Sequence, residues 1–478
     1  MNRIDANRLH IPAEGAMKVD ATIYASERIR LEDGAVRQLK DAASLPGVHR
    51  ALATPDIHVG FGVPIGCVVG LQGVVVPAAV GYDVNCGMRI VTTPATVGEV
   101  DPVAIAQSFA RDVPLGDGKK NLHVSRDELD VLLTKGVRGI AEIAGDVGRV
   151  WESRRADEEA DDITRIEDGG SMPGDARAVS DRAKERGLAQ LGTLGGGNHF
   201  IEVQRVDRVE DAQLASAWGI RTGGICVMIH SGSRGLGHQV GGDYMKLASK
   251  GSGGLERAPK LAWLNADSRD GRNYIGAMFA AANYAFVNRQ IMTMLVRRDL
   301  RHILGDVPLP IIYDVPHNMA KHEEHDGEML WVHRKGATRA FPPERMQGTP
   351  FAEVGQPVLI PGSMGTASYV LVGTSESSAT YHSVNHGAGR TMSRTEAAGG
   401  RRRWGKRPKK NQGRPAAISD DDFKRAMKGI HLIAENRWSV KEEAPQAYKD
   451  IDEVVRVVVD AGLARVVARM VPLAVLKG

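Results

Sequence analysis

Cysteine is scarce in this chain of 478 residues, where only Cys67, Cys86 and Cys226 occur, far apart and without a CxxC pair. So few thiols exclude a disulfide framework and favour a reducing compartment. No apolar run reaches the length of about 18 residues that a membrane span needs. The N-terminal stretch MNRIDANRLHIPAEG lacks the apolar core of a secretory signal peptide. These absences together predict a cytoplasmic protein that has no membrane partner.

A strong excess of charge is also lacking, since the formal net charge is only +4. The basic residues are unevenly distributed, however, and a segment at 401–414 holds Arg and Lys without any acid. Such a run contacts nucleic-acid phosphates by releasing their counterions. A solvated surface loop is the alternative reading of the same residues. This segment alone therefore does not decide between RNA contact and simple exposure.

The composition is that of a globular protein, with 42% hydrophobic and 25% charged residues, so a large core is expected. Strands and turns are predicted over most of 1–100, and helices over 101–150. A charged loop is predicted at 152–178. Further helices are expected at 180–191, 275–300, 418–435 and 448–470, and strands at 194–206, 223–235, 308–320, 357–374 and 471–478. Because strands and helices mix without a regular βαβ alternation, we predict an α+β fold, built as one compact unit over 1–478.

Four histidines lie in polar, glycine-rich turns or directly after apolar strand-like runs: His199 in GGGNHF, His230 in MIHSGSRG, His317 in YDVPHN and His386 in NHGAGR. An imidazole at a strand end is held rigidly while its nitrogen points into a cleft, which is the geometry that a metal site needs. A single histidine in such a place is more often structural than a ligand. The recurrence of one context at four positions is what favours a metal site.

Asp83 and Cys86 add oxygen and sulfur donors in the turn GYDVNCG. A carboxylate and a thiolate on one turn bind the same metal ion or bridge two ions. Mixed oxygen, nitrogen and sulfur ligands suit manganese, zinc or iron, and ligand type alone does not choose among them. Taken by itself, Cys86 is better explained as a small buried hydrophobic residue than as a ligand. No KxDG motif is present, so the nucleophile of lysine-adenylate ligases is missing.

Taken together, these segments resemble the RtcB family of RNA-splicing ligases. The shared strings run in order along nearly the whole chain: PDIHVGFGVPIG, GYDVNCGMR, LGTLGGGNHFIEV, HSGSRGLGHQ, ANYAFVNRQ, DVPHN, WVHRKGATRA, PGSMGTASYV, NHGAGRTMSRT, AYKDIDEV and the final LKG. One such string would be a weak signal, but this collinear set is highly specific. The resemblance implies an RNA ligase that uses GTP and two Mn²⁺ ions.

The resemblance also assigns roles to residues. One manganese ion would be held by Asp83, Cys86 and His199, and the second by Cys86, His230 and His317. His386 would be the catalytic residue that becomes guanylylated. The implied guanylate contacts are Asn198, His199, Phe200, Ile201, Glu202, His317, Asn318, Pro361, Gly362, Ser363, Met364, Ser368, His386, Gly387, Ala388, Gly389 and Lys477. Because Lys477 is the penultimate residue, this assignment requires a C-terminal tail that folds into the nucleotide site.

The reaction that the resemblance implies joins an RNA 3′-phosphate or 2′,3′-cyclic phosphate end to a 5′-hydroxyl end, in tRNA splicing or in RNA repair. Its partners would be such RNA ends and an activating protein of the archease type. Arg234 and Arg390 are candidate phosphate clamps, because a guanidinium fork matches phosphate geometry. Structural ion pairing within their loops is the alternative for both. Two departures from the family's usual pattern are Pro316, where Ser is common, and Asn385, where Cys is common.

Two other functions stay open from the residues alone. A metal-dependent RNA cyclic phosphodiesterase without ligation would need the same metal ligands but no GTP. A non-catalytic RNA-binding protein would use the basic segment, although binding gives no reason for so many candidate ligands.

Overall fold

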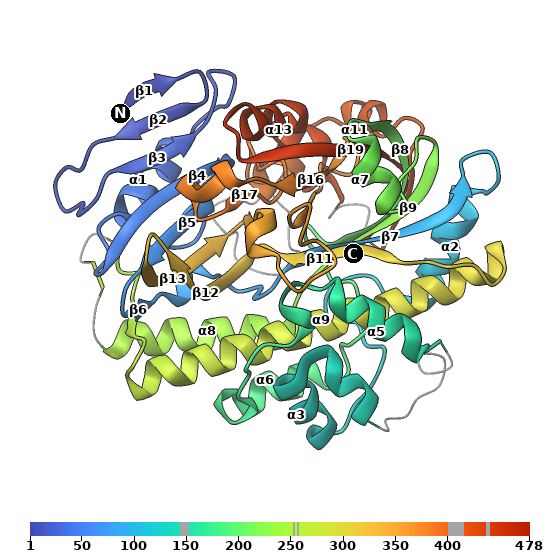
Figure 1. Ribbon diagram of the computed structural model, residues 1–478, viewed down its shortest axis with the longest axis horizontal. Coiled ribbons are helices and arrows are strands. Elements are labelled where there is room, and N and C mark those ends of the chain that lie inside the picture. The colour runs from blue at the N-terminus through green and yellow to red at the C-terminus, as the bar shows by residue number, and fades with distance from the viewer. Residues whose placement is uncertain (144–152, 252–253, 256–257, 400–414, 436–439) are drawn as a thin grey trace.

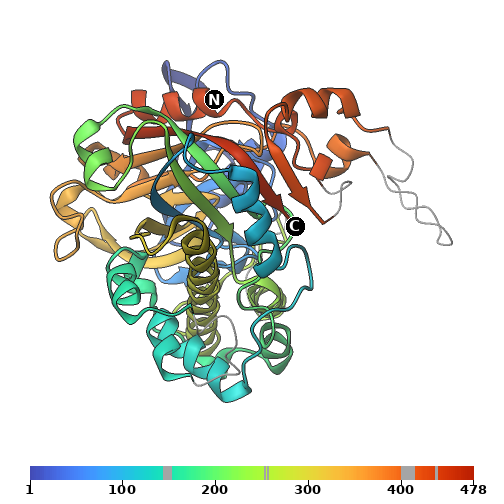
Figure 2. The ribbon, with the colours of Figure 1, turned by 90° about the vertical axis from the view of Figure 1, so that its right-hand side faces the viewer.

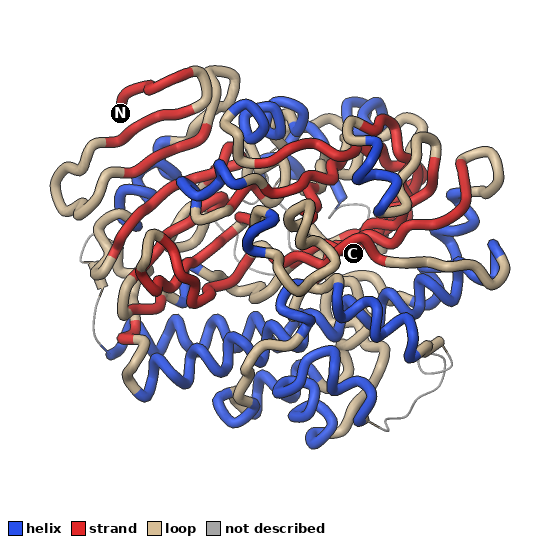
Figure 3. Tube along the Cα trace, viewed as in Figure 1, coloured by secondary structure: helices blue, strands red, loops and turns tan. Residues whose placement is uncertain are grey.

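The computed structural model describes residues 1–143, 153–251, 254–255, 258–399, 415–435 and 440–478. Two large β-sheets and a layer of helices form one compact unit, which confirms the α+β prediction (Figure 1). In the tube view the strands lie in the upper part and most of the long helices form a band below them (Figure 3). The predicted basic segment 401–414 lies outside the described residues.

The first sheet is built largely from the N-terminal part of the chain. Its strands follow the order β1-β2-β3-β4-β5-β13-β12, with β3 and β4 parallel and the other neighbours antiparallel. The strands are β1 (Asn2–Asp5), β2 (Arg8–Ile11), β3 (Ala21–Tyr24), β4 (Val48–His58), β5 (Ile65–Leu71), β12 (Asn318–His325) and β13 (Glu328–Lys335).

The second sheet carries the candidate metal ligands and the C-terminus. Its order is β11-β7-β9-β8-β19-β16-β15, and β18 pairs in parallel with β19. The strands are β7 (Gly87–Thr96), β8 (Phe200–Val209), β9 (Gly224–Ser231), β11 (Ile311–Pro316), β15 (Pro357–Ile360), β16 (Ser368–Gly373), β18 (His431–Ala434) and β19 (Ala464–Lys477). Two short ribbons pair β6 (Val74–Val75) with β10 (Leu264–Asn265) and β14 (Ala337–Arg339) with β17 (Ser383–Asn385).

Helix α9 (Arg269–Leu304) is the longest described helix, with 36 residues. The hydroxyl of Ser268 caps its start by accepting a hydrogen bond from the Gly271 N–H, and Gly305 follows its last turn with φ +81°. Residues 276–297 of α9 are buried on all sides, which is typical of a helix inside a core. Both ribbon views place α8 (Arg234–Gly251) and α9 below the sheets (Figures 1 and 2). The predicted helix at 275–300 is therefore confirmed and extended at both ends.

Of the other described helices, some pack on the sheets and some pack against α8 and α9. They are α1 (Asp33–Ala42), α2 (Pro102–Asp112), α3 (Arg126–Lys135), α5 (Ala156–Thr164), α6 (Asp181–Gly187), α7 (Ala212–Ala217), α10 (Arg394–Ala398), α11 (Asp420–Ala426) and α13 (Ile451–Asp460), with 3₁₀ turns η1 (Pro77–Ala79), η2 (Gly136–Glu142), η3 (Glu167–Gly170), η4 (Ala176–Ala178), η5 (Pro343–Arg345), η6 (Ser375–Thr380) and η7 (Pro445–Ala447). No helix in the described ranges combines the length and the apolar character needed to span a membrane.

Two helix predictions near the C-terminus were wrong in part. The segment 418–435 holds the short helix α11 and then strand β18, and the segment 448–470 holds α13 and then the first half of β19. Strand β19 is hydrogen-bonded on both sides, to β8 and β16, and this pairing fixes it in a sheet rather than a helix. Where the spacing of apolar residues is compatible with both a helix and a strand, tertiary pairing decides which of the two forms.

The predicted charged loop at 152–178 is also corrected where it is described. Its residues from 153 onward include helix α5 and the turns η3 and η4, and Asp162 and Glu167 are buried. Asp162 accepts two hydrogen bonds from the Arg297 guanidinium on α9, at 2.6 and 2.7 Å. An acid-rich sequence suggested exposure, but these acids pair with buried arginine and lysine side chains from distant elements.

Candidate metal centre and nucleotide pocket

The candidate metal ligands converge because they sit at the ends of four neighbouring strands. Cys86 directly precedes β7, His199 directly precedes β8, His230 lies near the end of β9, and His317 directly follows β11. Their order in the sheet is β11-β7-β9-β8, and Met88 and Phe200 both pair with His230 across it. This register aligns one edge of the sheet, so residues up to 231 positions apart in sequence meet at one place.

The ligand atoms form two overlapping groups around Cys86. The Cys86 Sγ lies 3.3 Å from His199 Nε2 and 3.2 Å from His230 Nε2, while His230 Nε2 lies 3.4 Å from His317 Nε2. Asp83 Oδ2 lies 2.8 Å from His199 Nε2. These are the two ligand sets expected from the sequence, Asp83–Cys86–His199 and Cys86–His230–His317, and each is compact enough to hold a metal ion.

The chemistry of these donors fits a cation. The His199 Nδ1 lies 3.1 Å from the Leu194 carbonyl, which only accepts, so Nδ1 donates there while Nε2 faces Asp83 and Cys86. Two ligands at about 2.1 Å from one tetrahedral ion lie roughly 3.4 Å apart, as the sulfur and nitrogen atoms do here. A cation placed among these atoms would accept lone pairs from oxygen, nitrogen and sulfur together.

Burial and the neighbouring groups set the ionisation of this cluster. Burial and the nearby Asp83 carboxylate raise the pKa of the Cys86 thiol well above its ordinary value. Burial alone would raise the pKa of Asp83, but the His199 imidazole and its hydrogen bond lower it to about 2. Burial also lowers the pKa of His230 and His317 well below the usual value, so both rings are neutral ligands. A bound divalent cation favours the thiolate and removes the obstacle to ionising Cys86.

Helix α9 holds the turns that carry the ligands, a role that the sequence did not reveal. The Arg289 guanidinium donates to the Asn85 carbonyl at 2.8 Å and the Ser231 carbonyl at 2.9 Å, next to Cys86 and His230. It also forms a two-point ion pair with Asp314 at 2.8 and 2.9 Å. Both side chains are fully buried. Such supporting hydrogen bonds fix the orientation of ligands before a metal ion binds.

His386 lies beside the metal ligands and is oriented by Asp56. The Asp56 Oδ2 atom lies 2.6 Å from His386 Nδ1 and accepts the His386 backbone N–H at 3.1 Å. A proton on Nδ1 leaves the Nε2 lone pair free to act as a nucleophile. The rings of His386 and His317 have centroids 4.9 Å apart. Sequence reasoning quoted the segment PDIHVG but gave Asp56 no role, since nothing local shows its partner 330 residues away.

The pKa of Asp56 suits its contact with His386. Burial alone would raise the pKa of Asp56, but the His386 imidazole and hydrogen bonds from His386 and Thr54 lower it below its usual range. The carboxylate is therefore ionised and keeps the Nδ1 proton of His386 in place.

A pocket of about 600 Å³ opens next to His386 and contains most of the predicted guanylate contacts. Those lining it are Asn198, Phe200, His317, Asn318, Pro361, Gly362, Ser363, Met364, His386, Gly387, Ala388, Gly389 and Lys477, together with the metal ligand His230 and with Arg390. The C-terminal tail is folded into the site, because Lys477 pairs with Phe200 between β19 and β8 and is only 4% exposed.

Four of the predicted guanylate contacts do not line the pocket. His199 belongs to the metal cluster. Ile201 points to the opposite face of β8 and packs into the hydrophobic core. Glu202 and Ser368 are buried and joined through the Gln204 amide, which donates to Glu202 Oε2 at 2.7 Å and to Ser368 Oγ at 3.0 Å. Burial raises the pKa of Glu202 to about 8.

The two arginines proposed as phosphate clamps differ. Arg234 is buried and binds the protein itself, donating to Thr193 Oγ1 and to the Gly116 carbonyl, both at 3.1 Å. Arg390 lines the pocket and also pairs with Glu443 at 3.0 Å and with the Tyr448 hydroxyl at 3.2 Å. The structural alternative therefore describes Arg234, whereas Arg390 has both a structural partner and access to the pocket.

Glu443, Tyr448 and Arg394 also line the pocket and were missed by sequence reasoning. Burial alone would raise the pKa of Glu443, but Lys477, Arg394 and Arg390 lower it to about 2. The signal that could have found Tyr448 and Arg394 was their place in the strings AYKDIDEV and NHGAGRTMSRT, whereas Glu443 lies outside both strings.

The two departures, Pro316 and Asn385, are accommodated locally. Pro316 ends the edge strand β11, where a missing N–H disrupts no central ladder. The Asn385 amide donates to the Gly387 carbonyl at 2.9 Å and so braces the turn that carries His386. Its Oδ1 atom is buried without a hydrogen-bond partner.

The fold and the site together define an α+β protein with a candidate metal centre beside an oriented histidine and a nucleotide-sized pocket. A family model described as "tRNA-splicing ligase RtcB" matches residues 38–478. The chain is 41% identical to the tRNA-splicing ligase RtcB of Thermococcus kodakarensis, covering 100% of this chain and 99% of that protein. It is 43% identical to the RNA-splicing ligase RtcB of Mycobacterium tuberculosis, covering 92% and 100%. The chain belongs to the RtcB family, which confirms the resemblance noted from its motifs.

Proposed function

We propose that this protein is an RNA ligase that uses GTP and two Mn²⁺ ions to join RNA 3′-phosphate or 2′,3′-cyclic phosphate ends to 5′-hydroxyl ends. The observation that carries the proposal is the Asp56–His386 pair, which faces a pocket beside a compact cluster of metal donors. Family membership supports RNA ligation, and the shape and donors of the site support the nucleotide and the metal.

The first step follows from the geometry of His386. With its proton held on Nδ1 by Asp56, the Nε2 atom attacks the α-phosphorus of GTP, a P–N bond forms, and pyrophosphate leaves. The metal ions, held by Asp83, Cys86, His199, His230 and His317, would neutralise phosphate charge and polarise the phosphorus. The buried Lys477 and the Arg390 guanidinium supply further positive charge at the pocket wall.

The remaining steps transfer the guanylate to RNA. A 2′,3′-cyclic phosphate is first opened by water to a 3′-phosphate. An oxygen of the 3′-phosphate then attacks the phosphorus on His386, the P–N bond breaks, and the histidine is restored. The RNA 5′-hydroxyl finally attacks the 3′-phosphate, loses its proton, and displaces GMP. An activating protein of the archease type stays a prediction.

The test is covalent labelling with GTP radiolabelled at the α-phosphate in the presence of Mn²⁺. We expect the protein to become labelled and His386→Ala to lose the label completely. His302→Ala is a matched control, because His302 is an exposed histidine on α9 that does not line the pocket next to His386. Labelling that persists in His386→Ala would overturn the proposal.

End-product assays separate this function from the two alternatives. A cyclic phosphodiesterase would open RNA cyclic phosphates equally well with and without GTP and would never join ends. A non-catalytic RNA-binding protein would give neither a label nor products. The ligase requires GTP for joining a defined pair of cyclic-phosphate and 5′-hydroxyl RNA ends.

A further inference from the structure

Lys449 is a buried lysine that the reaction steps above do not use. It lies between η7 and α13, is only 7% exposed, and does not line the nucleotide pocket. Its Nζ atom donates to the carbonyl of Pro55 at 3.0 Å and to the carbonyl of Ile57. These two carbonyls flank Asp56, so the ammonium group holds the backbone on both sides of the carboxylate that orients His386.

The backbone of Lys449 also contacts the segment that carries the nucleophile. Its N–H donates to the Gly389 carbonyl at 2.9 Å. Gly389 has φ +75°, and a Cβ atom there would lie 2.2 Å from the Asp56 carbonyl oxygen. The segments 55–57 and 386–389 therefore lie directly against each other, and Lys449 is hydrogen-bonded to both of them.

We infer that Lys449 is a positioning residue for guanylylation, which clamps segment 55–57 to segment 386–389 so that Asp56 and His386 stay aligned. This inference rests on the proposed function. A hydrogen-bonded pair that orients a nucleophile must be held to within about 0.5 Å, and loops do this less well than strands. The pair here joins the end of β4 to a turn after β17, so a third contact that ties both segments together supplies rigidity.

The charge of Lys449 is set by groups on several elements. Burial lowers its pKa to about 8, while the Asp56 carboxylate on β4 and Glu32 before α1 favour the charged form. His58 on β4 and His386 are the other titratable groups near this place. Because the folded pKa lies below the ordinary value, the charged clamp is complete below pH 8 and is lost as the pH rises through 8. An arginine at this position would stay charged.

The test compares single-turnover self-guanylylation of variants over a range of GTP concentrations. Lys449→Met keeps the length of the side chain but removes both hydrogen bonds. We expect its rate at saturating GTP to fall about 10- to 100-fold, since a misplacement of about 1 Å costs on that order. The GTP concentration for half-maximal rate should change less than about twofold, because the pocket walls are intact. Lys449→Arg should recover most of the rate and keep it above pH 8.

Lys184→Met is the matched control. Lys184 is also 7% exposed, and its Nζ donates to Asp130 at 2.9 Å on the helical side of the molecule, away from the pocket. Its loss should lower the melting temperature about as much as Lys449→Met while leaving the guanylylation rate unchanged. If Lys449→Met does not fold, Lys449→Gln gives the same comparison with one donor retained.

The outcomes separate this inference from the proposed function. A wild-type protein that GTP does not label overturns both. A labelled wild type with Lys449→Met reacting at the wild-type rate overturns the inference alone. A rate loss that Lys184→Met shows equally also overturns the inference, because it describes general destabilisation. A loss that comes entirely from weaker GTP binding overturns it too, because the alignment of Asp56 and His386 would then be intact.

Discussion

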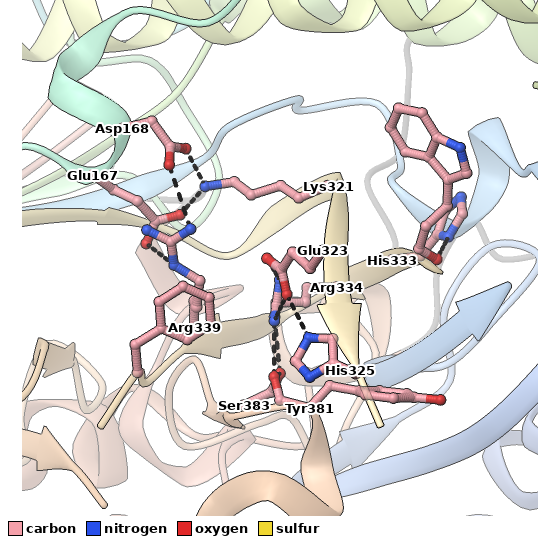
Figure 4. Close-up of polar contacts among 12 residues, drawn as sticks. Glu167, Asp168, Lys321, Glu323, His325, His333, Arg334, Arg339, Tyr381 and Ser383 are labelled. Carbon is pink, nitrogen blue, oxygen red and sulfur yellow. Dashed lines mark hydrogen bonds and ion pairs between the residues drawn. The ribbon is translucent and has the colours of Figure 1, made fainter. Parts of the chain in front are cut away.

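Two buried polar clusters in this protein are built on opposite principles. The candidate metal centre gathers Asp83, Cys86 and three histidines at one edge of a sheet. The second cluster joins β12, β13 and β14 to the turn η3 and alternates carboxylates with cations (Figure 4). Only the second pairs its carboxylates with guanidinium and ammonium groups.

The second cluster can be followed in Figure 4. The Arg334 guanidinium makes a two-point pair with Glu323 at 2.7 and 2.8 Å, and the same carboxylate lies 2.9 Å from His325 Nε2. Arg334 also donates to Ser383 Oγ at 2.8 Å and to the Tyr381 carbonyl at 2.9 Å. Alongside, Lys321 pairs with both Glu167 and Asp168. The arrangement needs nothing from outside, so it stabilises the fold rather than a ligand.

The contrast gives a criterion for distinguishing a binding site from structural burial. Where each buried carboxylate meets a guanidinium or ammonium group, removing one partner leaves a charge uncompensated. Where a buried carboxylate, a thiol and imidazoles gather without such a group, a bound metal ion would supply the positive charge. The difference can be tested by breaking each cluster in turn.

The largest expected effect comes from Cys86→Ala. Self-guanylylation should fall at least about 1,000-fold, because the variant loses the sulfur shared by both candidate metal sites. Mn²⁺ at about 100 times its dissociation constant should stabilise the wild type by about 2.7 kcal/mol. In Cys86→Ala this stabilisation should largely vanish. Thermal melts with and without Mn²⁺ measure it.

Cys226→Ala is the control for Cys86→Ala. Cys226 is equally buried, but it packs in a hydrophobic cluster that holds none of the five candidate metal ligands. Its Mn²⁺ response should match that of the wild type. Equal stabilisation of wild type and Cys86→Ala by Mn²⁺ would contradict the assignment of the sulfur as a ligand.

Glu323→Gln should have the next largest effect, on stability instead of activity. The change leaves the buried Arg334 without its charged partner, which costs about 3–5 kcal/mol in the free energy of unfolding. Urea denaturation measures the loss. The labelling rate of the folded fraction should stay near the wild-type value, and a variant as stable as the wild type would show that the ion pair is replaceable.

A smaller effect is expected from pH at His333, which Figure 4 also shows. His333 is fully buried, its Nδ1 donates to the Trp331 carbonyl at 3.0 Å, and its Nε2 accepts the Val76 N–H at 3.0 Å. Burial lowers its pKa to about 4. The unfolded chain, with a pKa of about 6.5, binds more protons between these values, so stability present above pH 6.5 is lost as the pH falls towards 4.

From pH 7 to pH 5 this one group should remove about 2 kcal/mol of stability. His333→Gln should flatten the decline by that amount, whereas the exposed His302→Gln should leave the slope unchanged. The measurement is urea denaturation at a series of pH values. An unchanged slope in His333→Gln would show that the ring is protonated without cost.

The sequence predicted candidate ligands that the structure brings together, because each lies in a distinctive local context. Turns such as GYDVNCG and GGGNHF place polar residues next to predicted strands. The collinear order of these strings along the chain indicated the family. Secondary structure was predicted well where one period dominated, as in α9. It failed at 464–470, where buried residues at 464, 467, 468 and 470 follow a helical spacing although the segment pairs as strand β19 with register shifts.

By itself, then, the sequence determined the family and predicted the candidate metal ligands and His386, because these depend on short strings with fixed chemistry. Only the tertiary structure decided which groups orient them. Asp56, Arg289 and Lys449 act on partners more than 50 residues away, and no local pattern encodes that contact. Their roles exist because sheet register and the buried helix α9 bring distant backbone carbonyls and side chains within hydrogen-bonding distance.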